Sequence, residues 1–496
     1  MYPEKQIFLV LGLSRSGRAA AEFLLARGAS TYIYDDVVSE RIERTARELI
    51  EKGAKRVEKE ALSRISELCD VLVLSPGIPI DHSLAVAFKR SGKAVVGETE
   101  LAARYMRCPV VAITGTNGKT TTVSMLTDIL CAGGYQAKAC GNVGTPMLDF
   151  CDLPKNGVAV AEISSFQLET LNSLCPHIAI VLNVSEDHLN RHYTMENYVF
   201  LKAKLLKNSS EAEYAILNYD DITVRTFAER TKARTYFFSV RERVNGAYYE
   251  NGTLYFNDEK ILSASELPIG GLHNVQNALA CITAAKIMGV STQAIVSALT
   301  SFKGVRHRIE FVGEVGGVAY INDSKGTNVD ATVKAVSCMK RETVLLLGGK
   351  NKGYDYSRLF ALLKKSSVVH AVLYGENRYE LLKSAREQAF ERITVCDKFE
   401  FAVKIAAMLA KNGQTVLLSP ASASFDEFAS YEERGESFVE IVRALEEAQT
   451  TPTEPQPQAP SDATENIGNI NGIDVANDAN DEITEIATYH QSQEIE

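Results

Sequence analysis

The segment TGTNGKTTT, residues 114–122, is the most informative stretch of this sequence. It follows an apolar run, PVVAI (109–113), and precedes SMLTDIL (124–130), whose apolar residues recur at helical spacing. A strand, a glycine turn, Lys-Thr and a helix form the arrangement that binds phosphate on backbone amides. The common phosphate loop has a first glycine where this chain has Ile113. The segment therefore predicts a nucleotide site, but of an uncommon subclass.

Each part of this loop has a chemical use. Backbone amides can surround a phosphate, Lys119 can contact its outer oxygens, and the Thr120 hydroxyl can bind Mg²⁺. An ordinary strand–helix turn with a chance lysine is the alternative, and the Gly-Lys-Thr run at the junction argues against it. The predicted nucleotide-binding residues here are Gly115, Thr116, Asn117, Gly118, Lys119, Thr120 and Thr121.

Length and charge limit the possible functions. A chain of 496 residues is expected to hold two to four domains. The net charge of −10 comes from the end of the chain, because residues 449–496 carry ten acids and no base. The remainder has 53 acidic and 53 basic residues, which argues against a nucleic-acid partner.

The termini and the cysteines indicate a cytosolic protein. The segment 448–496 is rich in Pro, Asn, Asp and Glu and is expected to be a disordered acidic tail. The N-terminus has no signal-peptide pattern, and no apolar run is long enough to cross a membrane. The nine cysteines lack metal-ligand spacing, so we expect a reducing, cytoplasmic location.

Alternating apolar and amphipathic segments predict an α/β fold of three domains. We expect a Rossmann-like domain over 1–107, a central phosphate-loop ATPase-like domain over 108–305 and a second Rossmann-like domain over 306–447. The central sheet is predicted to be mostly parallel. Antiparallel hairpins are expected at YENGTLYF (249–256) and at the nearby Asn245-Gly246 pair.

Polar residues follow several of the predicted strands. Glu162 ends GVAVAE, and the segment SEDH (185–188) follows another apolar run. Ligands collect at the carboxyl ends of parallel strands, so these acids favour a magnesium site beside the loop. His188 considered alone is more typical of a hydrogen-bonded loop residue than of a metal ligand. The turn LGLSRSG (11–17) is an incomplete dinucleotide motif and fits a structural turn as well as a binding turn.

The third predicted domain supplies further candidates. The segments RHR (306–308) and NDSKGTN (322–328) place Asp323 and Lys325 after an apolar strand, although a solvated turn is the alternative. The segment LLSPASASFDEF (417–428) ends a strand in small hydroxyl residues and begins a helix, where a carboxylate could bind. Serine caps are also common there.

Together these segments resemble the Mur ligases, ATP-dependent enzymes that build the peptide of bacterial cell-wall precursors. The resemblance rests on the following segments in this order: TGTNGKTTT, EISSFQLE (162–169), LNVSEDHLNRH (182–192), LHNVQNALA (272–280), HRIE (307–310), INDSKGTN (321–328) and LLSPASASFDEFASYEERGESF (417–438). LSPGIP (74–79) and the last segment look most like the branch that adds D-glutamate. The resemblance covers about residues 5–447.

The resemblance implies a reaction and its substrates. ATP would phosphorylate the alanyl carboxylate of UDP-N-acetylmuramoyl-L-alanine, and the amine of D-glutamate would displace the phosphate. It further implies two Mg²⁺ sites, with Thr120 and Glu162 at the first and His188 and Lys202 at the second, where Lys202 is typically carbamylated in the family. A monomer without nucleic-acid or membrane partners is expected.

The resemblance also assigns roles to further residues. The catalytic set would be Lys119, His188, Lys202 and Lys325, with Asn274, Arg308 and Asp323 at the nucleotide. The uridine nucleotide and precursor would contact Arg15, Ser16, Asp35, Asp36, Gly77 and Asn142. The D-glutamate pocket would be formed by Thr327, Lys352, Ser424, Phe425 and Tyr431.

Three departures from the family pattern and several rival functions remain. Asn190 stands where an aspartate is frequent, Ser14 replaces a usual glycine, and Phe425 and Tyr431 vary in type at their positions. The alternatives are another Mur-type or folylpolyglutamate-type amino-acid ligase, a catalytically inactive nucleotide-binding paralogue, and a phosphate-loop kinase. The last would not need the clusters around Lys325 and Ser424.

Overall fold

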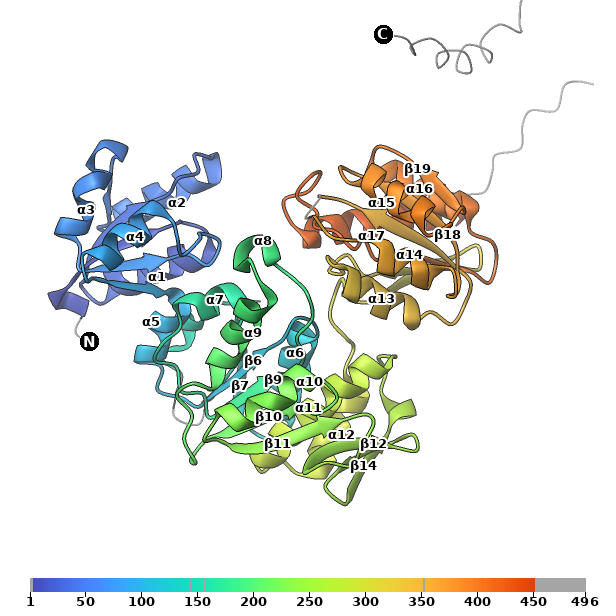
Figure 1. The fold of residues 1–496 in the computed structure, drawn as a ribbon, viewed down its shortest axis with the longest axis horizontal. Helices are drawn as coiled ribbons and strands as arrows, with labels where there is room; N and C mark the ends of the chain where they lie inside the picture. The colour runs from blue at the N-terminus through green and yellow to red at the C-terminus, as the bar shows by residue number, and fades with distance from the viewer. Residues whose placement is uncertain (1–2, 143, 155–156, 351–352, 451–496) are drawn as a thin grey trace, which may run out of the picture. The chain divides into compact units, whose positions relative to one another are not determined.

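The computed structural model describes residues 3–142, 144–154, 157–350 and 353–450. Within these residues the chain forms three β-sheets with helices packed against them, coloured blue, cyan to yellow-green, and yellow to red along the chain in Figure 1. The predicted fold class is thereby confirmed. The domain limits at residues 107, 305 and 447 stay predictions, and beyond Thr450 the predicted tail lies outside the described residues.

The first sheet is parallel throughout, in the order β3-β2-β1-β4-β5. Phe8 and Val10 of its middle strand belong to one core cluster and Leu9 and Leu11 to another. Both faces of this strand are therefore buried, which explains why its sequence is uniformly apolar. The strands are β1 (Ile7–Leu11), β2 (Ser30–Tyr34), β3 (Lys55–Arg56), β4 (Val71–Leu74) and β5 (Ala94–Gly97). The helices are α1 (Arg15–Ala26), α2 (Glu40–Glu51), α3 (Leu62–Leu68), α4 (Ser83–Arg90) and α5 (Glu98–Tyr105).

The central sheet has the order β14-β13-β12-β11-β10-β9-β6-β8-β7 and is parallel except at β12, β13 and β14. The strand before the phosphate loop, β6, is buried at every position. The strands are β6 (Val110–Thr114), β7 (Gln136–Gly141), β8 (Gly157–Glu162), β9 (Ile178–Val181), β10 (Tyr214–Asn218), β11 (Arg234–Ser239), β12 (Gly246–Glu250), β13 (Thr253–Phe256) and β14 (Glu259–Ser263). The helices are α6 (Lys119–Ala132), α7 (Ser165–Thr170), α8 (Leu189–His192), α9 (Met195–Ala203), α10 (Ile222–Arg225), α11 (Leu272–Ile287) and α12 (Thr292–Ser301).

One of the two predicted hairpins is present and the other is wrong. Strands β12 and β13 are antiparallel, as YENGTLYF predicts. Strands β11 and β12 instead run parallel, with Phe237 opposite Gly246. The chain first reverses after Ser239, whose hydroxyl accepts from the amides of Arg241 and Glu242. It reverses again at Gly246, which has φ +139°, so that the Asn-Gly pair begins a parallel strand rather than closing a hairpin.

The third sheet has the order β15-β16-β20-β17-β18-β19, and only its β15–β16 pair is antiparallel. Its strands are β15 (Glu310–Val315), β16 (Val318–Asn322), β17 (Thr343–Gly348), β18 (Val368–Tyr374), β19 (Ile393–Val395) and β20 (Thr415–Leu418). Its helices are α13 (Val329–Ser337), α14 (Ser357–Leu363), α15 (Arg378–Glu387), α16 (Phe399–Leu409) and α17 (Tyr431–Thr450).

Caps fix two short helices that carry polar residues discussed below. Ser164 and Gln167 form a capping box at the start of α7, and Asn328 caps α13 by accepting from the amide of Ala331. Such caps satisfy backbone amides that a helix start leaves unpaired. No helix in the described part of the chain is both long and apolar enough to cross a membrane.

Candidate active site

The phosphate loop joins β6 to α6 as the sequence predicts. Gly118 has φ +87°, and a Cβ there would lie 2.5 Å from Asn277 Oδ1, so this position requires glycine. Asn183, which follows β9, clamps the loop. Its side chain accepts from the amide of Asn117 at 2.8 Å and donates to the Asn117 carbonyl at 3.0 Å. The Lys119 ammonium donates to the Gly115 and Thr116 carbonyls, so it lies within the loop that it is predicted to serve.

Thr120 and Glu162 meet beneath this loop. The Thr120 hydroxyl donates to Glu162 Oε2 at 2.8 Å, and the Asn142 side chain donates to Glu162 Oε1 at 2.8 Å. Glu162 is 1% exposed, and burial alone would raise its pKa; the charges of Lys325 and Lys119 outweigh burial and hold the pKa below its usual value. A buried, ionised carboxylate beside a hydroxyl suits a hard divalent cation. These residues therefore fit the predicted first magnesium site.

Lys325 reaches this pair from the third sheet. Its ammonium donates to Thr120 Oγ1 at 2.7 Å and lies 4.9 Å from the centre of the Tyr431 ring. Burial and the charge of Arg308 lower the pKa of Lys325 to about 7, although Glu162 opposes the shift. The structure thus brings together residues that are about 200 positions apart in the sequence, as the prediction required.

The residues predicted for the second metal site lie in and before α9. Lys202 is 1% exposed, and burial together with the charge of Lys119 lowers its pKa well below the usual value. His188 has φ 56°, and its imidazole lies 3.5 Å from the Asp187 carboxylate. Among the described residues, no group of three or more His, Cys, Asp and Glu side chains could hold a metal. A second site would therefore depend on Lys202 as a ligand, and it stays a prediction.

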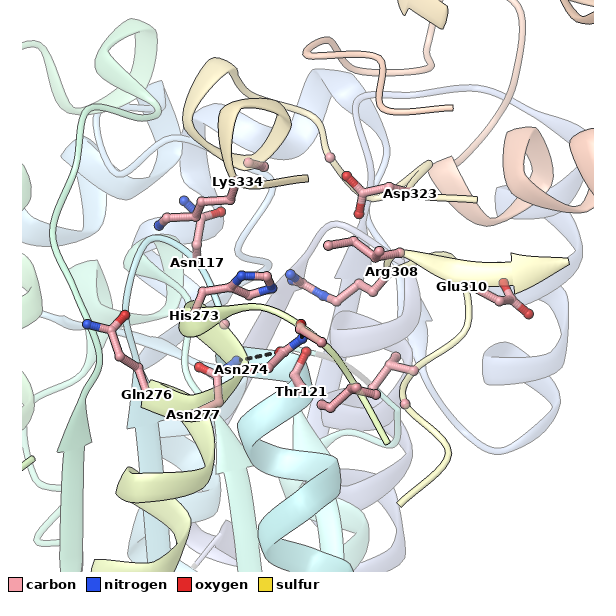
Figure 2. Close-up of a pocket in the computed structure, with 18 of the residues that line it drawn as sticks. Asn117, Thr121, His273, Asn274, Gln276, Asn277, Arg308, Glu310, Asp323 and Lys334 are labelled. Carbon is pink, nitrogen blue, oxygen red and sulfur yellow. Dashed lines mark hydrogen bonds between the residues drawn. The ribbon is translucent and has the colours of Figure 1, made fainter. Parts of the chain in front are cut away.

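A cavity of about 540 Å³ opens beside the phosphate loop (Figure 2). Its lining includes six of the predicted nucleotide residues, namely Asn117, Gly118, Thr121, Asn274, Arg308 and Asp323. Asn277 donates to Asn274 at 3.2 Å, and the Arg308 side chain points toward the ring of His273 (Figure 2). Within the described part of the chain, Arg308 Nε is buried and has no hydrogen-bond partner, as expected of a group that binds a ligand.

Burial shapes the charges around this cavity. It lowers the pKa of His273 to about 4, and the charges of Lys334 and Arg308 act in the same direction. It raises the pKa of Asp323 to about 7, against the hydrogen bond that Ser419 donates at 2.7 Å. At neutral pH His273 is therefore uncharged, and cationic Arg308 faces the cavity, which favours an anionic ligand.

The predicted D-glutamate residues are only partly brought together. Tyr431 adjoins Lys325, and Thr327 lies in the same loop as Lys325, to whose carbonyl its amide donates at 2.9 Å. Ser424 is 2% exposed, and its buried hydroxyl has no hydrogen-bond partner among the residues that the structure describes. Phe425 is 68% exposed and lines a separate groove with Lys350 and Arg378. Lys352 lies outside the described residues.

The predicted precursor residues surround the first glycine turn. Asp35 accepts from the amide of Leu13 at 2.6 Å, and Asp36 pairs with His82 at 3.0 Å. Arg15 donates to the Asn142 carbonyl at 2.7 Å, so it reaches the edge of the central sheet, where Asn142 also contacts Glu162. Ser16 lies in the first turn of α1, and the Gly77 carbonyl accepts from Arg191 at 3.4 Å.

Asp330, Asn328, Tyr354 and Arg191 are polar residues of the site that were not among the predicted ones, whereas Asp187 belongs to the predicted acidic segment SEDH. Asn117 donates to Asp330 of α13 at 2.7 Å, and Asp187 accepts from Asn328 and Tyr354 at 3.2 and 2.8 Å. Arg191 contacts the loop of Gly77. Position near the end of a strand is a signal that could have identified Asn183, which is the second residue after β9. No sequence signal predicts the partners of Asp330, Asp187 and Arg191, because those partners lie in other domains.

Two family matches cover most of the central and third sheets. Residues 113–285 match the Mur ligase middle domain, and residues 307–422 match the Mur ligase glutamate ligase domain.

Two similar relatives, each covered almost to its full length, carry the same name. A UDP-N-acetylmuramoylalanine–D-glutamate ligase from Pelotomaculum thermopropionicum is 40% identical over 452 residues, which is 88% of this chain and 97% of the relative. A protein of the same name from Caldanaerobacter subterraneus is 39% identical over 447 residues, covering 89% and 99% of the two chains.

Solved structures share the fold at low sequence identity. The UDP-N-acetylmuramate–alanine ligase MurC from Thermotoga maritima matches with a TM-score of 0.59 at 17% identity, covering 88% of this chain and 99% of that one. MurF ligase from Thermotoga maritima in complex with ADP matches with a TM-score of 0.57 at 18% identity, covering 91% and 98%. At this identity the similarity concerns the fold alone.

Proposed function

The chain belongs to the Mur ligase family, and from this premise we propose that it adds D-glutamate to UDP-N-acetylmuramoyl-L-alanine at the expense of ATP, in peptidoglycan precursor synthesis. It is thus an ATP-dependent acid–amino-acid ligase. The observation that carries the proposal is the contact of Lys325 with Thr120 beside Glu162. It joins the phosphate loop to the domain in which the amino-acid pocket is predicted.

The reaction needs a leaving group, because a carboxylate does not condense directly with an amine. Phosphoryl transfer to the alanyl carboxylate gives an acyl phosphate, and the amine of D-glutamate then attacks its carbonyl carbon and releases phosphate. ATP supplies the phosphoryl group, and Mg²⁺ when bound screens the charge of the reacting anions.

The chain's own residues bind and neutralise these anions. Lys119 and the loop amides are suited to hold the outer phosphates, and Arg308, whose buried Nε finds no acceptor among the described residues, lines the cavity. Lys325 is placed to stabilise the phosphoryl group in transfer, since its ammonium lies at the Thr120 hydroxyl. Thr120 and Glu162 would hold one magnesium ion, and His188 and Lys202 a second.

We further propose that Lys202 is carbamylated. Only a neutral amine reacts with carbon dioxide, and burial favours the neutral form of Lys202 at ordinary pH. Carbamylation would convert this amine into a carboxylate-like ligand. In protein equilibrated with ¹³C-bicarbonate we expect a carbamate carbon signal that Lys202→Ala removes. An identical spectrum from the two proteins would argue against the modification.

The function is tested with a panel of amino acids in a phosphate-release assay that contains ATP, Mg²⁺ and the UDP precursor. D-Glutamate is expected to stimulate release, whereas L-alanine and diaminopimelate are not. Stimulation by one of these instead would assign the chain to a different branch of the ligases. Lys119→Ala should abolish release but retain precursor binding, whereas an inactive paralogue would release no phosphate even as the unaltered protein.

The remaining features of the proposal follow from the substrates. UDP-precursor, ATP and D-glutamate are small dissolved molecules, so we propose that the enzyme acts in the cytoplasm, as a monomer, without nucleic-acid or membrane partners. Sedimentation of the purified protein with and without substrates checks the oligomeric state.

A further inference from the structure

Arg191 of α8 connects the central domain to the loop that follows β4. Its side chain is 12% exposed, and its guanidinium binds both carboxylate oxygens of Glu169 at 2.9 and 2.6 Å. The same group donates to the Ile78 carbonyl of the first domain at 2.8 Å. A planar guanidinium can satisfy a carboxylate and a carbonyl at once, which a lysine cannot do.

The loop that Arg191 reaches belongs to the predicted precursor site. Ser75 donates to the Gly12 carbonyl at 2.9 Å, and a Cβ at Gly12 would lie 2.8 Å from Ile78 Cδ1. The loop 75–78 therefore lies directly against the glycine turn that precedes Arg15 and Ser16. A second contact joins the same segments, because the Tyr193 hydroxyl donates to Asp81 at 2.9 Å.

On its other side Arg191 lies against the aromatic ring that supports His188. The guanidinium carbon is 5.1 Å from the centre of the Phe166 ring, and that ring is 4.7 Å from the imidazole of His188. Phe166 also contacts His192 at 5.4 Å. Arg191, Phe166 and His188 thus form a continuous packed row from the precursor loop to a predicted metal ligand.

The surroundings hold this row in one arrangement. The Glu169 side chain is 8% exposed, and burial alone would raise its pKa, but the adjacent Arg191 guanidinium and the His192 ring 3.3 Å away keep that pKa below the usual value. The non-glycine residues His188 and Tyr193, on either side of α8, have φ of 56° and 67°. Such conformations persist only where surrounding contacts enforce them.

We propose that Arg191 is a positioning residue that couples occupancy of the precursor loop 75–78 to the placement of the His188 ring. The inference rests on the proposed function, because it concerns the precursor and metal sites of the same reaction. Precursor bound at this loop would hold the Ile78 carbonyl against Arg191 and, through Phe166, hold His188 in place.

The test compares three variants with a matched control. Arg191→Ala removes the contacts to Glu169 and Ile78. Arg191→Lys keeps a positive charge without the planar guanidinium, and Phe166→Leu removes only the aromatic ring. Arg243→Ala is the control, because Arg243 also binds both oxygens of a glutamate, Glu250, and lies 5.7 Å from an aromatic ring, on the exposed connection between β11 and β12. If Arg191→Ala fails to fold because Glu169 is left unpaired, the double variant Arg191→Ala/Glu169→Gln replaces it.

Phosphate release gives the first readout. Because Arg191→Ala loses charged hydrogen bonds, we expect its KM for precursor to rise about tenfold and its kcat to fall about tenfold. Both constants of Arg191→Lys should lie between those of the wild type and Arg191→Ala. Phe166→Leu is expected to lower kcat and leave the KM for precursor unchanged. Kinetic constants for Arg191→Ala equal to those of Arg243→Ala would overturn the proposal.

Metal affinity gives a readout that needs no turnover. Mn²⁺ binding is followed by electron paramagnetic resonance in the presence of a non-hydrolysable ATP analogue, with and without UDP-N-acetylmuramoyl-L-alanine. Precursor should raise Mn²⁺ affinity several-fold in the wild type and in Arg243→Ala, but less in Arg191→Ala. An equal rise in Arg191→Ala would refute the coupling. Absence of D-glutamate-dependent turnover in the wild type would instead refute the proposed function, and the titration would still decide the coupling.

Discussion

The ammonium of Lys325 lies 2.7 Å from the Thr120 hydroxyl, which itself donates to Glu162. Thr120 opens the helix after the phosphate loop, whereas Lys325 follows the β16 strand of the third sheet. A cation from one domain therefore enters the polar centre of another. Because the group is buried, its electrostatic effect on a nearby phosphate is larger than it would be in water.

Replacement of this cation should slow the reaction strongly. Lys325→Ala is expected to lower kcat for phosphate release at least about 100-fold, as is typical when a donor to developing charge is removed. Precursor affinity, measured by calorimetry, should not change, because the predicted precursor residues lie in the first two domains. Lys404→Ala, which removes an exposed lysine paired with Glu400, is the control. Near-normal release by Lys325→Ala would exclude the catalytic role.

The contact between Asn117 and Asp330 should influence nucleotide binding. Asp330 of α13 accepts from the loop residue Asn117 at 2.7 Å, so it helps to fix the loop beside the cavity. Loss of this hydrogen bond in Asp330→Ala predicts a KM for ATP raised about five- to tenfold. The double variant with Asn117→Ala should show less than the sum of the two single rises, because both changes break the same hydrogen bond, while Asp330→Ala also removes the carboxylate that pairs with Lys334 at 2.8 Å. Additive effects would show that the two residues act separately.

Ser424 and Phe425 are adjacent in the sequence, but their replacement should affect the KM for D-glutamate differently. The buried Ser424 hydroxyl makes no hydrogen bond to residues 3–142, 144–154, 157–350 or 353–450, so Ser424→Ala breaks none of the described hydrogen bonds and should leave thermal stability unchanged. If the hydroxyl binds the amino acid, the KM for D-glutamate should rise about tenfold. Phe425 is 68% exposed and lines another groove, so Phe425→Ala should change this KM less. A larger rise of this KM in Phe425→Ala than in Ser424→Ala would place the D-glutamate pocket at the groove that Phe425 lines.

Local sequence patterns predict the parts of this site that depend on a single strand–turn–helix unit. The phosphate loop lies between β6 and α6, and Glu162 ends β8, because apolar runs and glycine turns specify such units without distant contacts. The Asn245-Gly246 pair shows that a local turn signal does not determine the direction of the strand that follows it. It does form a reversal, but the direction of the next strand depends on the earlier reversal after Ser239.

Contacts between domains cannot be predicted from local sequence patterns. Asn117 and Asp330 are 213 residues apart, and Arg191 and Ile78 are 113 apart. Hydrophobic periodicity places each residue on its own helix or loop, whereas the pairing depends on how separate sheets pack. Local pattern predicts Lys325 from its position after an apolar strand, whereas Lys202 comes only from the resemblance to the Mur ligases, because local pattern alone favours a solvated helix lysine there.

A buried glutamate at the start of α5 should make stability depend on pH. Glu98 is 2% exposed and accepts from the amide of Leu148 at 2.8 Å. Burial raises the pKa of Glu98 to about 7, although the hydrogen bonds from Leu148 and Thr99 oppose the rise. The folded protein therefore holds a proton that the unfolded chain has already lost between pH of about 4.5 and 7. Stability from this group is present below that interval and is lost as pH rises through it.

Glu98→Gln should remove this dependence, because the amide oxygen can still accept from Leu148 without becoming charged. At pH 8 the variant is expected to be more stable than the wild type by roughly 2–3 kcal/mol, and the difference should vanish near pH 4. Thermal unfolding midpoints across this pH range provide the measurement. Glu51→Gln, at an exposed position at the end of α2, serves as control and should follow the wild type throughout. A variant whose midpoint runs parallel to that of the wild type from pH 4 to 8 would show that Glu98 does not titrate in this interval.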